Sequence, residues 1–205
     1  MIICVIILGY KFLKEGLLIN FCREESTLDN KEYNVQCSYA DKQKAANLLS
    51  QLNDTSHQII NYVYSKYGDK QNARGKASRN LRNRYRGRSR MVETDPNNSE
   101  KDTSYVIDKG FLLSLCLRSS KNKDEADFHH INVLKFVLIH ELSHIAADVD
   151  NHPIEFWIIF KWLLTEAQEA ELYTHRSFER DPVDYCSLLN ISYTPTDDEG
   201  LPKLD

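Results

Sequence analysis

The sequence contains no Cys-x-x-Cys pair, and its cysteines are odd in number and widely separated. The five are Cys4, Cys22, Cys37, Cys116 and Cys186. A disulfide framework in a small secreted domain usually has an even number of closely spaced cysteines. We therefore expect reduced thiols and a main domain that faces a reducing, cytosolic compartment.

The N-terminal segment lacks both a signal peptide and an uninterrupted apolar run of membrane length. It has no basic leader and no small-residue cleavage site. Residues 2–8 and 16–21 are mainly apolar, but Lys11, Lys14 and Glu15 lie between them, whereas a spanning helix needs about 20 apolar residues. We predict an uncleaved anchor over residues 1–21, spanning or interfacial, and hence association with a membrane or virion. The alternative is a hydrophobic helix docked on a protein partner.

Acidic residues are missing from residues 74–90, which hold eight basic ones. In an extended strand the last five arginines would all face one way, because every second side chain points to the same side. These five are Arg82, Arg84, Arg86, Arg88 and Arg90. Such a row predicts an anionic partner: nucleic acid, anionic lipid, or an acidic protein such as a capsid component. The alternative is a solvated loop whose charges are balanced by nearby acids.

The chemically most specific stretch is His140-Glu141-Leu142-Ser143-His144, preceded by an apolar run over 133–139. Residues four apart on a helix lie on one face, so both imidazoles can reach the same metal ion. Glu141 points to a different side and can act on a water instead of ligating the metal. The pattern predicts a buried helix that carries two zinc ligands, and the alternative is a core helix with two hydrogen-bonded histidines.

A catalytic zinc site needs a third protein ligand and one open position. His152 is our candidate, because turn-forming residues separate it from His144 and Pro153 suits the first turn of a new helix. The chain would then fold back toward the first two ligands. The alternative third ligand is Glu166 or Glu169 on that second helix.

This arrangement resembles the minimal zincin peptidases of the WLM and SprT-like group, especially the versions carried by large DNA viruses. The resemblance rests on the motif at 140–144, on His152 with Phe156 and Trp157 after it, and on the segment 181–186. It implies an α+β zincin core, in which a small sheet packs on the motif helix, and Zn²⁺ as cofactor. The chain departs from the metzincin pattern, since its spacer is longer and has no glycine, and no methionine follows His152.

Residues 105–117 give the clearest strand signal, with a turn expected at 108–110 and a strand over Phe111 to Leu117. The resemblance implies that this strand is a sheet edge that binds extended substrate through Phe111, Leu113 and Leu115. The alternative is an ordinary buried strand. His129 and His130, which follow it, are expected to lie at the start of the motif helix and not to ligate metal.

The remaining organisation follows from length and periodicity. A chain of 205 residues can bury one sizeable core. We expect a linker over 22–40, a main domain over 41–193 and a polar tail over 194–205. A long amphipathic helix should run from Asp41 to a stop at Gly68, and the segment 154–164 should form a buried helix.

The predicted function is that of a zinc metallopeptidase, with Zn²⁺ held by His140, His144 and His152 and with Glu141 as general base. Its substrate would be a protein or peptide. The competing class is a structural or assembly protein, such as a minor capsid component attached to a membrane or virion, which keeps the zincin fold whether or not it cuts. The two classes differ in whether a biological role depends on Glu141.

Overall fold

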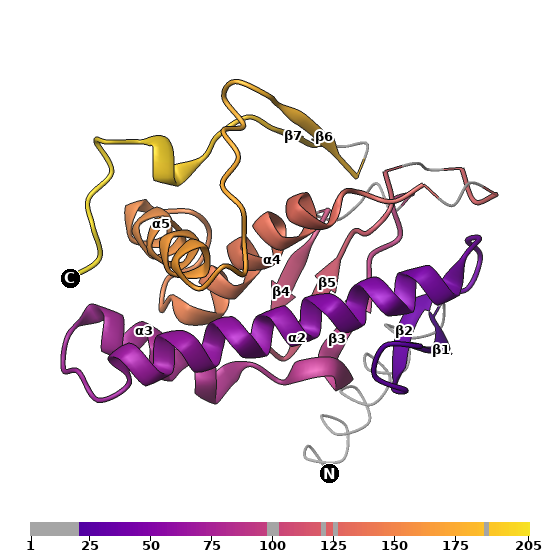
Figure 1. Ribbon diagram of the computed structural model, residues 1–205, viewed down its shortest axis with the longest axis horizontal. Coiled ribbons are helices and arrows are strands. Elements are labelled where there is room, and N and C mark those ends of the chain that lie inside the picture. Colours follow the sequence, from indigo (N-terminus) through magenta and orange to yellow (C-terminus); the bar gives the residue numbers. More distant parts are fainter. Residues whose placement is uncertain (1–20, 98–102, 120–121, 125–126, 187–188) are drawn as a thin grey trace, which may run out of the picture.

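The computed structural model describes residues 21–97, 103–119, 122–124, 127–186 and 189–205, which form a mixed β-sheet with helices packed against it (Figure 1). The helices are α2 (Lys42–Tyr67), α3 (Ala73–Arg84), α4 (Ile131–Ala146) and α5 (Ile154–Glu169), with short 3₁₀ helices η1 (Gly87–Arg90) and η2 (Pro195–Asp197). The strands are β1 (Phe21–Glu25), β2 (Glu32–Gln36), β3 (Met91–Glu93), β4 (Tyr105–Ile107), β5 (Leu112–Leu115), β6 (Val183–Tyr185) and β7 (Leu189–Ile191). The expected α+β class is confirmed.

The main sheet has five strands in the order β1-β2-β3-β5-β4. Its three central strands run parallel, with Asn34 opposite Val92 and Met91 opposite Leu113. The two outer strands pair antiparallel with their neighbours, so each end of the sheet is a hairpin. Strands β6 and β7 form a separate antiparallel pair near the other end of the chain.

Helix α2 matches the helix expected from the apolar periodicity. The Asp41 side chain caps its start by accepting a hydrogen bond from the Lys44 amide, and the helix ends at Tyr67, directly before Gly68. Leu52, Ile59 and Val63 are almost completely buried. The helix lies along β1, β2 and β3, so this stripe forms the core between the first helix and the sheet.

The predicted linker over 22–40 is wrong, because most of it forms the β1–β2 hairpin. Tyr33 and Val35 alternate inward and are buried against the core, as the two-residue period of a strand requires. The turn between the strands is closed by a hydrogen bond from the Ser26 amide to the Lys31 carbonyl (2.8 Å). β2 contains only two inward-facing apolar residues, which are too few to identify a strand from periodicity.

The expectation of reduced thiols is also wrong for four of the five cysteines. Cys22 is bonded to Cys37, and Cys116 is bonded to Cys186. The second bridge joins residues separated by 70 positions in the chain. Spacing along the sequence could not reveal this contact, because the fold brings the two cysteines together from different elements. Cys4 lies outside the described residues.

The basic segment 74–90 is helical instead of extended, which corrects the predicted arginine row. Residues 73–84 form α3, whose buried face contains Ala77, Ser78 and Leu81. Arg88 and Arg90 belong to η1, and Arg86 lies in the connection between the two helices. Along a helix, residues two apart point in different directions, so the alternation of arginines does not produce one charged face.

The predicted substrate strand is not at the edge of the sheet. β5 lies between β3 and β4, and its residues Leu113 and Leu115 are buried. The turn expected at 108–110 is present, and it connects β5 to β4, which is the edge strand. The order of strands depends on pairing between distant segments, and local periodicity does not encode it.

The predicted polar tail is packed against the helices. Thr194 is fully buried, and the Leu201 carbonyl accepts a hydrogen bond from Lys161 of α5 (2.9 Å). The final residue, Asp205, accepts a hydrogen bond from the Ala73 amide at the start of α3 (2.9 Å). Backbone groups of the tail therefore serve as acceptors for helices far away in sequence.

The predicted anchor over 1–21 lies outside the described residues, except for Phe21, which begins β1. Within the described ranges, every helix is too short or too polar to traverse a bilayer.

Candidate metal centre

Two histidines of the motif lie on one face of α4. The helix is held by buried apolar residues on its other sides, among them Leu138, Ile139 and Leu142. The Nε2 atoms of His140 and His144 lie 3.2 Å apart. His130 caps the start of α4 through its Nδ1 atom, which accepts from the Asn132 amide (3.2 Å), as expected for a residue at the helix start.

His152 completes the cluster. After α4 the chain turns back through Asn151, whose φ of 58° is left-handed, and α5 begins after Pro153. The His152 Nε2 atom lies 3.1 Å from that of His144 and 3.0 Å from that of His140. The three nitrogens therefore form a nearly equilateral triangle, and these residues form a group that could hold a metal ion.

Hydrogen bonding alone does not satisfy this triangle. A neutral imidazole nitrogen either donates or accepts a hydrogen bond, so among three mutually adjacent Nε2 atoms at least one pair must be two donors or two acceptors. One cation at the centre would accept all three lone pairs. Nitrogens bound to a tetrahedral zinc at about 2.0–2.1 Å lie roughly 3.3 Å from one another, which is close to the spacing found here.

Aromatic residues of α5 fix the orientation of the imidazoles. The Phe156 ring stacks on His144, with centroids 4.3 Å apart, and presents its edge to His140 and His152. The Trp157 indole N–H donates to the His152 carbonyl (3.1 Å). These contacts explain why two aromatic residues follow His152 in the sequence.

Burial keeps the two helical histidines in the neutral form that binds metal. It lowers the pKa of His140 well below its ordinary value, and the neighbouring His144 and His152 act in the same direction. The pKa of His144 falls to about 4, again mainly through burial. Metal ligation requires neutral imidazole, so no proton has to be removed at neutral pH.

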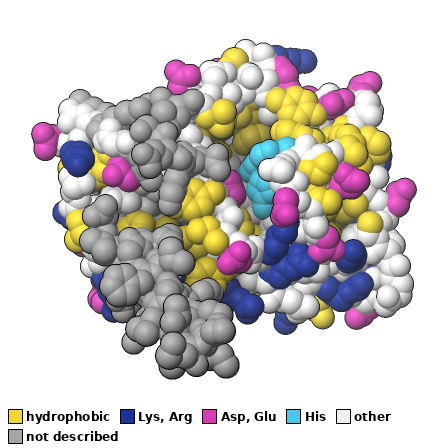
Figure 2. All heavy atoms as spheres, turned by 180° about the vertical axis from the view of Figure 1, so that it is seen from behind, with side chains coloured by type: hydrophobic (Ala, Val, Ile, Leu, Met, Phe, Trp, Pro, Cys, Tyr) yellow, Lys and Arg dark blue, Asp and Glu magenta, His cyan; other side chains and the backbone are white. Residues whose placement is uncertain are grey.

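Glu141 is buried and faces the same cavity as the three histidines. The cavity measures about 1050 Å³ and lies between α4, the edge strand β4, the β6–β7 hairpin and α5. Figure 2 shows the histidines at a hollow in the surface, with hydrophobic side chains gathered around them. The arrangement can hold a metal ion beside a carboxylate in a partly apolar cleft that opens to solvent.

The alternative third ligands are used elsewhere. Glu166 is buried, and its carboxylate accepts hydrogen bonds from Tyr67 (2.5 Å), Trp162 (3.1 Å) and Lys66 (2.6 Å). Glu169 pairs with the same Lys66 ammonium at 2.8 Å. Both carboxylates join α5 to α2 and lie outside the histidine cluster.

Four arginines of the predicted row lie in different environments, and the side chain of the fifth, Arg88, is outside the described part of the structure. Arg82 is exposed with its guanidinium over the Tyr64 ring, Arg86 is exposed, and Arg90 lies over the Phe111 ring. Arg84 contacts the loop between His144 and His152. The predicted substrate residues Leu113 and Leu115 are buried in β5, and the cavity borders Tyr105 and Val106 of β4 instead.

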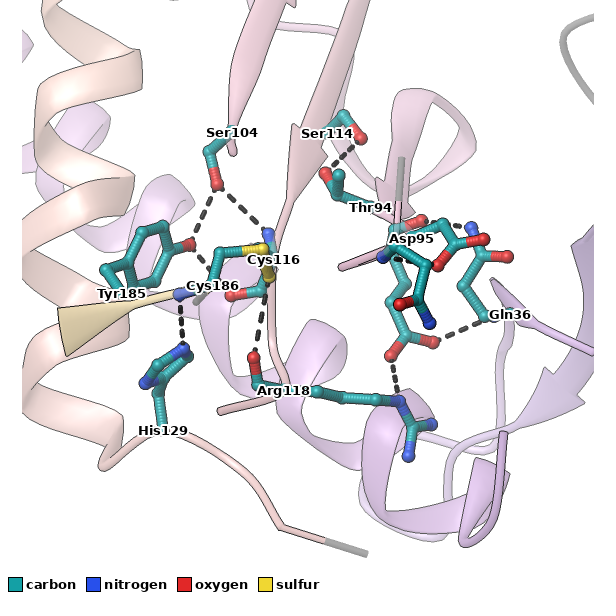
Figure 3. The surroundings of a disulfide bond; sticks show 12 residues. Gln36, Thr94, Asp95, Ser104, Ser114, Cys116, Arg118, His129, Tyr185 and Cys186 are labelled. Carbon is teal, nitrogen blue, oxygen red and sulfur yellow. Dashed lines mark hydrogen bonds and ion pairs between the residues drawn. A yellow bond between two sulfur atoms is a disulfide. The ribbon is translucent and has the colours of Figure 1, made fainter. Parts of the chain in front are cut away.

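The β6–β7 hairpin is the part of the site whose position the sequence did not predict. Its Tyr185 hydroxyl donates to the Cys116 carbonyl (2.7 Å) and lies 2.8 Å from the Ser104 hydroxyl oxygen, beside the Cys116–Cys186 disulfide (Figure 3). The Cys186 amide donates to His129 (3.0 Å). The segment 181–186 stood out by resemblance, but its contacts with Ser104, Cys116 and His129 depend on the fold.

Comparison with known proteins gives two viral relatives. The chain is 32% identical to an uncharacterized protein of Acanthamoeba polyphaga mimivirus over 174 residues, which cover 80% of each chain. It is 36% identical over 74 residues to an uncharacterized protein of Invertebrate iridescent virus 6, which cover 36% of this chain and 40% of that protein. The chain therefore belongs to the same family as the mimivirus protein, in agreement with the viral context that the sequence predicts. No family model and no solved structure matches the chain.

Proposed function

We propose that this protein is a zinc-dependent metallopeptidase with a zincin-like active site. The observation that carries the proposal is the triangle of Nε2 atoms of His140, His144 and His152, with spacings of 3.0–3.2 Å, beside the buried carboxylate of Glu141. Zinc held by three imidazoles supplies a Lewis acid that makes water nucleophilic near neutral pH and polarises a carbonyl group.

Glu141 has the position of a general base in this proposal. It follows a ligand directly on α4, and its side chain borders the cavity without belonging to the group of ligand atoms. Its carboxylate would take a proton from the attacking water and deliver that proton to the leaving amine. The buried surroundings of Glu141 limit competing contact with bulk solvent.

The edge strand supports a peptide as substrate. In the described sheet β4 pairs only with β5, and its residues Tyr105 and Val106 border the same cavity as the motif helix. An extended peptide can add to such an edge through backbone hydrogen bonds, which would carry its scissile bond past the histidines. β4 thus takes the role that the resemblance assigned to residues 111–117.

The test is the Glu141→Gln variant of the full-length chain, assayed with a library of quenched fluorescent peptides. We expect one zinc ion per chain in both proteins and a loss of hydrolysis of at least 10²-fold in the variant, since a general base contributes 10²–10⁴-fold. Glu155→Gln, an exposed carboxylate in the first turn of α5, is the matched control and should keep full activity. Equal hydrolysis by Glu141→Gln and the parent protein would overturn the assignment.

A further inference from the structure

The loop between the second and third histidines is held at six of its seven positions by side chains of other elements. Residues Ile145 to Asp150 cover the end of α4 and most of the connection to His152. Each of these six residues offers a carbonyl or carboxylate oxygen that interacts with a basic or amide side chain from elsewhere. The side chains are Lys76, Asn80 and Arg84 of α3 and Lys109 of the β4–β5 turn.

The three residues of α3 are spaced four apart, so they form one stripe along the helix. Arg84 uses Nη1 to donate to the carbonyls of Ile145 and Ala147, both at 3.1 Å. Its Nη2 atom lies 2.6 Å from the Asp148 carboxylate. One guanidinium therefore contacts three of the four residues that follow His144.

The other two members of the stripe extend this contact. Asn80 donates to the Ala146 carbonyl (2.9 Å) and to Asp148 Oδ1 (3.1 Å). The Lys76 ammonium pairs with Asp148 Oδ2 at 2.6 Å. Both oxygens of this carboxylate are thus occupied, and hydrogen bonds from Lys76 and Arg84 lower the pKa of Asp148 to about 2.

Lys109 holds the second half of the loop. Its ammonium donates to the Val149 carbonyl and lies 2.9 Å from the Asp150 carboxylate. Lys109 has a φ of 51°, so the turn between the two outer strands directs this side chain toward the loop in a left-handed conformation. The next residues are Asn151 and His152.

These contacts have a physical purpose at the end of a helix. The last carbonyls of α4 have no partners within the helix, and cations are favourable at a helix C-terminus because of its partial negative charge. The loop itself contains no glycine and carries two carboxylates. Figure 2 shows Lys and Arg side chains gathered next to the histidines on this face.

We propose that Lys76, Asn80, Arg84 and Lys109 are positioning residues of the metal centre, which fix the 145–150 loop so that His152 meets the two helical histidines. They do not touch the metal. The proposal rests on the proposed zinc site but not on peptide hydrolysis. In this proposal the basic residues Lys76, Arg84 and Lys109 have partners within the protein, in the 145–150 loop.

The test is zinc affinity, measured on the full-length chain by competition with a chromophoric chelator. We expect Arg84→Met to weaken zinc binding about 10- to 100-fold, the range known for residues that orient metal ligands. Arg82→Met is the matched control, because Arg82 lies on the same helix but is exposed and stacks over Tyr64. Its affinity should equal that of the parent protein.

A double-mutant cycle distinguishes positioning from general loss of structure. If Arg84 acts through His152, then Arg84→Met should have little further effect on zinc affinity in a His152→Ala background. An equal loss in both backgrounds, or unchanged affinity in Arg84→Met, would overturn the proposal. Lys109→Met provides a second variant from a different element and should behave in the same way as Arg84→Met.

The outcomes also separate this proposal from the proposed function. Suppose that the parent protein binds zinc, that Arg84→Met and His152→Ala are coupled in the double-mutant cycle, and that no peptide is cleaved. This result would contradict the proposed peptidase activity and support the positioning role of the four residues. A parent protein that binds no zinc would contradict both. The absorption spectrum of the Co²⁺-loaded protein gives an independent readout, because a displaced His152 should change the coordination geometry in Arg84→Met.

Discussion

At the scale of single residues, the two candidates for the third metal ligand, His152 and Glu166, have different surroundings. His152 faces the two helical histidines, whereas Glu166 is enclosed by Lys66, Tyr67 and Trp162. His152 therefore belongs to the histidine cluster, and Glu166 joins α5 to α2.

We therefore predict opposite effects for two alanine substitutions. His152→Ala should weaken zinc binding by more than tenfold with little change in the free energy of unfolding of the metal-free protein. Glu166→Ala should keep zinc affinity and lower that free energy by about 1–3 kcal/mol, because it leaves buried donors without their acceptor. Zinc titration and urea unfolding of both variants check this, and tight zinc binding by His152→Ala together with loss in Glu166→Ala would reverse our assignment.

The histidine cluster could be predicted from the sequence because its geometry is local. A helix fixes the spacing of His140 and His144, and a short turn-rich segment brings His152 back. The role of Arg84 could not be predicted in this way, since its partners lie about 60 residues further along the chain. Its alternation with other arginines suggested a strand, and only the packing of α3 on α4 gives it an internal function.

At the scale of elements, the helices α2 and α4 and the strand β5 followed from patterns in the sequence, whereas the strands β1, β2 and β3 did not. α2 and α4 contain several turns of apolar repeat, whereas β2 shows only Tyr33 and Val35. The strand order, which makes β4 the edge, depends on pairings across the whole chain. The β6–β7 hairpin has little apolar signal of its own, and its disulfide, Tyr185 and His129 attach it to the rest.

The contact between this hairpin and His129 predicts a pH dependence of stability. Burial lowers the pKa of His129 to about 4, and its neutral Nε2 accepts a hydrogen bond from the Cys186 amide. The unfolded chain takes up this proton near pH 6.5, but the folded chain resists it until about pH 4. Stability should therefore fall as the pH drops through this window, by roughly 1–3 kcal/mol from this residue.

The measurement compares the parent protein with His129→Gln, whose amide oxygen can also accept the hydrogen bond. Unfolding in urea at several pH values between 7 and 4 should give a shallower dependence for the variant. His140 and His144 titrate in both proteins, so their contribution cancels in the difference. Identical pH profiles for the two proteins would show that protonation of His129 does not lower the stability of the folded protein.

At the scale of the whole molecule, two disulfides join cysteines that the sequence analysis expected to be reduced. Cys22–Cys37 closes the first hairpin, and Cys116–Cys186 joins the residue directly after β5 to the β6–β7 hairpin. Closing a longer loop restricts the unfolded chain more strongly.

We predict that replacing Cys116 and Cys186 by serine lowers the free energy of unfolding by about 4 kcal/mol, because this bridge closes a loop of 70 residues. Replacing Cys22 and Cys37, which close a loop of 15 residues, should lower it by about 3 kcal/mol. Urea unfolding of the two double variants gives the comparison. Alkylation of the denatured, unreduced parent protein with mass analysis is the control. Labelling of all five cysteines there would contradict both bridges and restore the expectation of free thiols.

The longer bridge has a topological consequence for the metal centre. His140, His144 and His152 all lie between Cys116 and Cys186, so the whole histidine cluster is part of one covalent ring. A single backbone break anywhere inside that ring would leave the two halves of the nicked chain joined, and the fragments would separate only under a thiol reductant. On a non-reducing gel, a preparation cut in this way would run as one covalently joined species of full-length mass.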